Sequence, residues 1–149
     1  MRPSRGDTLH FEVPGQRRPT VVFLTGVGGT TSYWASRVAS LAVPYRLVLI
    51  DLPGFGRSPE LRTTYSIERH VTELHRVLTD RGSLTLVGHS FGAIAAAAYA
   101  ARHPEQVDAL VLLSLPNFGG EEQVLNYYRN PPTADRWDVP AGTRIPSQS

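Results

Sequence analysis

Short apolar runs alternate along the chain with longer stretches in which apolar residues recur at helical spacing. Runs rich in β-branched and aliphatic residues occupy positions 20–24, 46–51, 84–87 and 107–115. An uninterrupted apolar run suits a strand that is buried on both faces, as in a parallel sheet. Residues Thr8 to Val13 alternate between apolar and polar instead, which predicts one further short strand.

Helical spacing appears between these runs. Trp34, Val38 and Leu41 are four and three positions apart, so we expect them to share the buried face of one helix. Thr31 or Ser32 is expected to cap its first turn, because short hydroxyl side chains accept bonds from helix N–H groups.

Two further helices complete the pattern. The first begins at Ser66 and ends at Gly82, and its apolar positions are Ile67, Val71, Leu74 and Leu78. The second is rich in alanine, follows the run at 84–87 and ends near His103, because Pro104 cannot continue a helix. Strands and helices thus alternate regularly, which predicts an α/β fold with a mostly parallel sheet of about five strands and flanking helices.

The composition excludes several classes of function but does not by itself identify one. The 149 residues are 41% hydrophobic and 19% charged, and the formal net charge of +2 is spread along the chain, so no nucleic-acid surface is expected. The absence of cysteine excludes disulfides, thiolate catalysis and thiolate metal sites. Neither a signal peptide nor a membrane-length apolar stretch is visible. We therefore expect a cytoplasmic protein that uses no metal or cofactor and acts on a small molecule, away from membranes.

The candidate functional residues follow the ends of predicted strands. Gly26–Gly29, Asp51–Ser58, Ser90 and 116–118 each come directly after an apolar run. In a parallel sheet the carboxyl ends of the strands share one edge, which is where ligands bind. The sequence Gly88-His89-Ser90-Phe91-Gly92 has the G-x-S-x-G pattern of a sharp turn from strand to helix that exposes a serine hydroxyl. The Gly26–Gly29 turn fits neither the dinucleotide fingerprint nor the phosphate-binding P-loop.

Three blocks together resemble the α/β-hydrolase family, over roughly residues 8–118. Thr25-Gly26-Val27-Gly28-Gly29 with Trp34 is similar to the oxyanion loop, Asp51 to Ser58 to the D-x-P-G-x-G-x-S loop, and Gly88 to Gly92 to the nucleophile elbow. The resemblance implies an incomplete α/β-hydrolase fold, with a core at 1–118 and the start of a lid or cap helix at 119–130. Residues 131–149 are rich in proline, glycine, serine and charge without any period, which predicts an irregular or disordered tail.

The same resemblance implies roles for five residues. Ser90 would be the nucleophile that attacks a carbonyl carbon. The backbone N–H groups of Val27 and Phe91 would form the oxyanion hole. Trp34 and Phe55 would contact the substrate. The implied activity is hydrolysis of an ester, amide or related acyl substrate, whereas the family's epoxide hydrolases would carry Asp at position 90.

The chain also departs from the family pattern. Thr25 stands where the family usually has His, and the family's acid and base follow later strands, in the order Ser, Asp or Glu, His. The last histidine here is His103, which we expect to face solvent after the Ala-rich helix. His89 is expected to pack below the turn. His70 and His75 fall off the apolar stripe of their helix, and Asp51 is expected to brace the loop that follows it.

Three hypotheses follow. The chain is the N-terminal part of a longer hydrolase with little activity alone, or a catalytically inactive relative that acts as a binding or interaction protein, or a subunit whose partner supplies acid and base in trans. In each case the strand at Val107–Leu115 is expected at the sheet edge, where its apolar face favours self-association.

Overall fold

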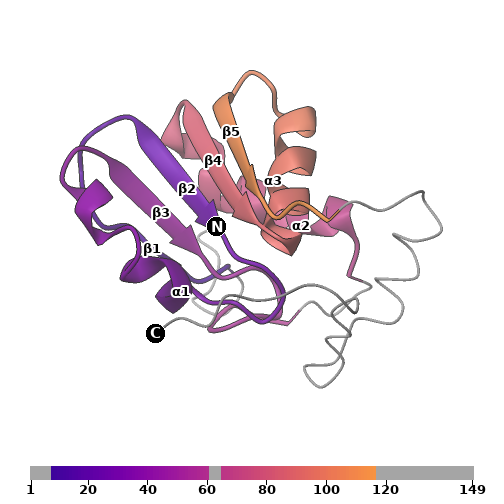
Figure 1. Ribbon diagram of the computed structural model, residues 1–149. Coiled ribbons are helices and arrows are strands. Elements are labelled where there is room, and N and C mark those ends of the chain that lie inside the picture. Colours follow the sequence, from indigo (N-terminus) through magenta and orange to yellow (C-terminus); the bar gives the residue numbers. More distant parts are fainter. Residues whose placement is uncertain (1–7, 61–64, 117–149) are drawn as a thin grey trace, which may run out of the picture. The chain divides into compact units, whose positions relative to one another are not determined.

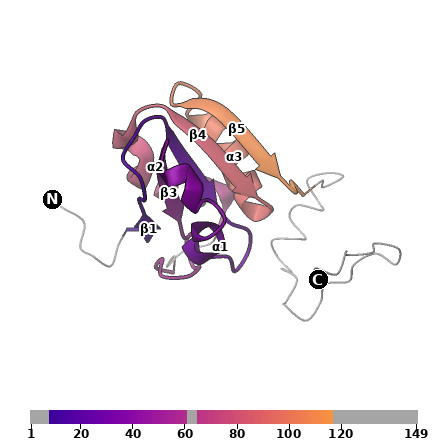
Figure 2. The ribbon, with the colours of Figure 1, turned by 60° about the vertical axis from the view of Figure 1, so that its left-hand side comes forward.

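The apolar runs form one twisted sheet flanked by helices in the computed structural model, which describes residues 8–60 and 65–116 (Figures 1 and 2). The strands among these residues are β1 (Phe11–Glu12), β2 (Thr20–Leu24), β3 (Arg46–Ile50), β4 (Leu84–His89) and β5 (Val107–Leu113). The helices are α1 (Thr31–Ala35), η1 (Ala39–Ala42), α2 (Ile67–Leu78), η2 (Thr79–Arg81) and α3 (Phe91–Arg102), where η denotes a 3-10 helix. The predicted lid helix and tail lie outside the described residues.

The sheet has the strand order β1-β3-β2-β4-β5. Strands β3, β2, β4 and β5 are parallel, and β1 runs antiparallel to β3, with Phe11 opposite Ile50. The prediction of a mostly parallel α/β sheet of about five strands is therefore confirmed. The first strand is shorter than the predicted range of Thr8 to Val13, because only Phe11 and Glu12 pair with β3.

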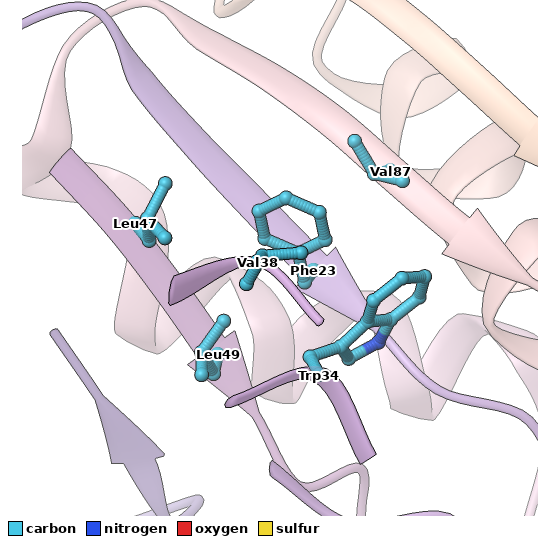
Figure 3. Close-up of a cluster of buried hydrophobic side chains, with 6 residues drawn as sticks. All are labelled: Phe23, Trp34, Val38, Leu47, Leu49 and Val87. Carbon is cyan, nitrogen blue, oxygen red and sulfur yellow. The ribbon is translucent and has the colours of Figure 1, made fainter. Parts of the chain in front are cut away.

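The two faces of the sheet are covered differently. Helices α2 and α3 lie side by side on one face, and α1 lies on the other (Figures 1 and 2). On the α1 face, buried side chains from three strands and the first helical region form one hydrophobic cluster (Figure 3), which consists of Phe23, Trp34, Val38, Leu47, Leu49 and Val87. This alternation of inward positions along each strand is the period-2 pattern of a sheet buried on both faces.

The helix predicted to carry Trp34, Val38 and Leu41 is interrupted. The N–H groups of Arg37 and Val38 both bond to the Trp34 carbonyl, at 2.9 and 3.0 Å, and α1 ends before them. Leu41 then lies in η1 with 37% of its surface exposed. The predicted caps are also wrong, since Thr30 is the N-cap and its side chain makes no capping bond. The predicted helix start at Ser66 is confirmed: Ser66 is the N-cap of α2, and its hydroxyl accepts a bond from the Arg69 N–H at 3.2 Å.

Strand β5 forms the open edge of the sheet within the described residues, as predicted for this part of the chain. Its side chains are mostly exposed, with Leu110 at 38%, Val111 at 42% and Leu113 at 41%. By contrast, the neighbouring strand β4 is mostly buried. No helix in the described part of the chain is long and apolar enough to cross a membrane.

Candidate active site

The loops that carry the candidate functional residues meet at one edge of the sheet. Leu24 of β2 lies beside both Ile50 of β3 and Gly88 of β4, so these strands end at nearly the same level. The Ser90 N–H donates to the Leu113 carbonyl at 2.9 Å, which joins the turn after β4 to the end of β5. The convergence expected from the sequence is confirmed for the described strand ends.

Ser90 occupies the sharp turn between β4 and α3. Its backbone has φ 55° and ψ −119°, in a region that L-residues other than glycine rarely adopt. Such a backbone costs of order 1–3 kcal/mol and persists only where the surrounding structure enforces it. The enforcement comes from Gly88 and Gly92: a Cβ at Gly88 would lie 2.3 Å from the Gly92 oxygen, and one at Gly92 would lie 2.4 Å from the Leu24 oxygen.

The glycine-rich loop after β2 lies directly against this turn. A Cβ at Gly26 would lie 3.0 Å from Ser90 Cβ and 3.5 Å from Ser90 Oγ. The Gly29 N–H closes the loop on the Gly26 carbonyl at 3.0 Å. Val27 projects from this loop with 47% of its surface exposed, and Phe91 is the first residue of α3. The structure therefore brings the predicted oxyanion loop to Ser90, and the donor roles of Val27 and Phe91 stay predictions.

Asp51 connects the loops on either side of it through hydrogen bonds, as expected. Its side chain is buried, and Oδ1 accepts a bond from the Thr31 N–H at 2.6 Å while Oδ2 accepts one from the Arg57 N–H at 3.0 Å. The carboxylate thus caps α1 from another loop and holds the Gly56 turn close, since a Cβ there would lie 2.3 Å from Oδ2. The two loops on either side of Asp51 are consequently held in a fixed relation.

The two predicted substrate contacts lie in different surroundings. Trp34 is only 6% exposed and packs against Phe23 with ring centroids 5.0 Å apart, inside the cluster of Figure 3. Phe55 is half-buried in the turn after β3, where its carbonyl accepts a bond from the Ser58 N–H at 2.9 Å. Trp34 therefore has a place in the core, and a substrate role for either residue stays a prediction.

None of the five histidines is placed to act as a general base for Ser90. The sequence has five, and all fall among the described residues: His10, His70, His75, His89 and His103. None of them bonds to Ser90 Oγ. His89, the nearest in sequence, stacks on Tyr33 with ring centroids 5.7 Å apart. A serine without a base within hydrogen-bond reach is not activated for attack.

Two histidines lie elsewhere than expected. His70 is buried, its Nδ1 lies 2.8 Å from the Ser66 carbonyl, and its ring meets Phe91 edge-on at 5.0 Å. Burial lowers the pKa of His70, so the neutral form is favoured. His103 does not face solvent freely, because its ring stacks on His75. Both errors arise because the packing of one helix on another buries residues beyond its apolar stripe.

One contact near the site had no signal in the sequence. Tyr33 of α1 stacks on His89, meets Trp34 edge-on at 5.0 Å, and carries the Arg37 guanidinium 4.3 Å from its ring centroid. This aromatic group connects α1 with the residue before Ser90.

Comparison with known proteins agrees with the geometry. Residues 19–144 match the family model described as alpha/beta hydrolase fold. A putative carbamate hydrolase RutD of Escherichia coli O157:H7 (strain EC4115 / EHEC) is 37% identical over 99 residues, which cover 64% of this chain and 37% of the relative. Among solved structures, a marine microorganism esterase has a TM-score of 0.70 at 25% identity, over 80% of this chain and 48% of that one.

A thioesterase domain from the curacin biosynthetic pathway is also similar, with a TM-score of 0.69 at 32% identity, over 83% of this chain and 50% of that domain. The chain therefore spans just over a third of the matched curated relative and about half of these solved structures.

Proposed function

Because this chain belongs to the alpha/beta hydrolase fold family, we propose that Ser90 is the nucleophile of a serine hydrolase acting on small acyl substrates. The substrate class is an ester, an amide or a related acyl compound. A carbamate is one such compound, and its inclusion rests on the relation to RutD. The observation that carries the proposal is the strained turn of Ser90 packed against Gly26.

The proposed chemistry assigns the nucleophile and the oxyanion donors to atoms of the site, and it requires a general base other than the five histidines to carry the proton from Ser90 to the leaving group. Ser90 Oγ attacks the carbonyl carbon, and the oxyanion that forms is stabilised by the N–H groups of Val27 and Phe91, each worth about 3 kcal/mol of barrier. The alcohol or amine then leaves, and water releases the acyl group from Ser90. The proton of Ser90 Oγ must pass to a general base, and none of the five histidines is placed to receive it.

The proposal is tested by the selectivity of covalent labelling. In long incubations with excess fluorophosphonate, we expect Ser90 to be modified before any other serine, because an oxyanion hole without a base still favours reaction about 10³–10⁴-fold over water. Mass spectrometry of the digested adduct locates the label, and Ser90→Ala is the control. Labelling spread evenly over surface serines would contradict the proposal and favour an inactive binding protein.

We further propose that β5 mediates association with a second copy of the chain. Among the described residues its outer backbone edge is unpaired and its exposed side chains are mostly apolar, with Asp108 as the one charged residue of the strand. Light scattering across a concentration series should show a dimer or a larger species for the parent chain and a monomer for Val111→Lys. Val43→Lys is the matched control, because Val43 is 75% exposed but lies outside the strands. A parent chain that stays monomeric at every concentration would disprove the association.

A further inference from the structure

A second cluster of titratable side chains lies where α2 and α3 end, at the opposite end of α3 from Ser90. The imidazole rings of His75 and His103 stack with centroids 4.1 Å apart and only 1° between their planes. We propose that this stack is a proton-operated contact, which holds the end of α2 against the turn after α3 and opens in mild acid when His103 takes up a proton.

The hydrogen bonds around the stack have a defined direction. The Leu78 carbonyl only accepts, so the Gln106 amide nitrogen donates to it, at 2.6 Å. The Gln106 amide oxygen then accepts the Tyr99 hydroxyl proton at 2.6 Å. With its proton used, the Tyr99 oxygen accepts from His75 Nδ1 at 3.1 Å. His75 therefore carries its single proton on Nδ1 in the neutral form, and a second proton can add only to Nε2.

Tyr99 keeps its hydroxyl proton in this chain of bonds at neutral and mildly acidic pH. Burial, with the Glu105 carboxylate nearby, raises the pKa of Tyr99 to about 12. The network ties α2 to α3 and to Gln106, just before β5. The Tyr99 phenol is therefore not the pH-sensitive member of the cluster.

The charges that face His103 come from three elements. Burial lowers its pKa, and the neighbouring His75 of α2 and Arg102 of α3 lower it further. Glu105, in the turn after α3, lies 3.8 Å from His103 Nδ1 and acts in the opposite direction, although its side chain is 73% exposed. Two stacked imidazolium rings would face each other as like charges, so the second proton is taken up only when the contact loosens.

Solvent reaches the cluster through a surface pocket of about 380 Å³. The pocket is lined by His75, Thr79, Gly82, Ser83, Glu105 and Gln106. Protons can therefore exchange with the stack without unfolding of the domain. The pocket lies at the start of β4 and β5, at the opposite end of β4 from Ser90.

The first test is an NMR titration of the His103 ring in three chains. His75→Phe keeps an aromatic face and removes the charge, so the pKa of His103 is expected to rise. Glu105→Gln removes the attractive carboxylate, so the pKa of His103 is expected to fall. Opposite shifts in these two variants support the proposal. A His103 titration curve that is the same in all three chains would overturn it.

The second test measures stability against pH. Since the pKa of His103 is lowered in the folded chain, its contribution is full above pH 6.5 and is lost as pH falls through the folded pKa. His70 has the same sign and remains in both chains, so it serves as an internal reference. The urea midpoint of His103→Phe should fall less than that of the parent between pH 7.5 and 5.0, because one of the two histidines with a lowered pKa is removed. An unchanged fall would contradict the proposal.

Discussion

The purified 149-residue chain is expected to hydrolyse activated esters about 10⁶-fold more slowly than an enzyme with a complete triad, because removing the base alone costs roughly that factor. All five histidines are engaged away from Ser90 Oγ. The remaining rate, about 10³–10⁴-fold over water, would come from the oxyanion hole and substrate binding. Steady-state assays with p-nitrophenyl esters measure it.

Two controls separate this expectation from a simple loss of folding. Ser90→Ala should lower the residual rate by less than about tenfold, because the residual does not use the triad. Added imidazole should accelerate fluorophosphonate labelling at Ser90 but not in Ser90→Ala, since it supplies the missing base in solution. Rapid ester turnover by the unmodified chain would overturn the expectation and require a base other than the five histidines.

Gly92→Ala is expected to destabilise the chain by more than about 3 kcal/mol, beyond the usual range for overpacked cores. In an ordinary helix the same change stabilises by about 1 kcal/mol. Here the new Cβ would lie 2.4 and 2.5 Å from the backbone oxygens of Leu24 and Thr25, which cannot rotate away. Urea unfolding followed by circular dichroism measures the loss.

The matched control for Gly92 is Gly28→Asn. Gly28 has φ 72°, a conformation that Asn tolerates, and nothing lies within 4 Å of a Cβ built there. Its effect should stay within about 1 kcal/mol. If Gly92→Ala unfolds at the same urea concentration as the parent, the close approach of α3 to β2 is not a constraint on this fold. A large loss in Gly28→Asn alone would point to the glycine-rich loop instead.

The oxyanion loop, the Asp51 loop and the elbow depend on one another. Asp51 holds the start of α1, which follows the glycine-rich loop, and Gly26 of that loop lies against Ser90. A change in any of the three is therefore expected to move the others, because buried polar networks and close backbone contacts do not relax independently. This dependence supports treating the three loops as one site.

The sequence by itself determined the strands and the turns of this protein. Apolar runs predicted β2 at Thr20–Leu24 and placed β3 and β4 within a few residues, because local burial on both faces leaves an uninterrupted pattern. The glycines around Ser90 predicted the elbow, because only glycine permits such a close approach of strand and helix.

Only the tertiary structure decided which distant side chains meet. Asp51 caps α1 across 20 residues, His70 lies against Phe91, and His75 stacks on His103. These contacts depend on how the helices pack on the sheet and on each other. The apolar stripe of a helix predicts that one face is buried, but it does not show which element covers that face. The sequence already predicted that Ser90 has no histidine partner, and the fold adds where the five histidines lie, with His89 stacked on Tyr33.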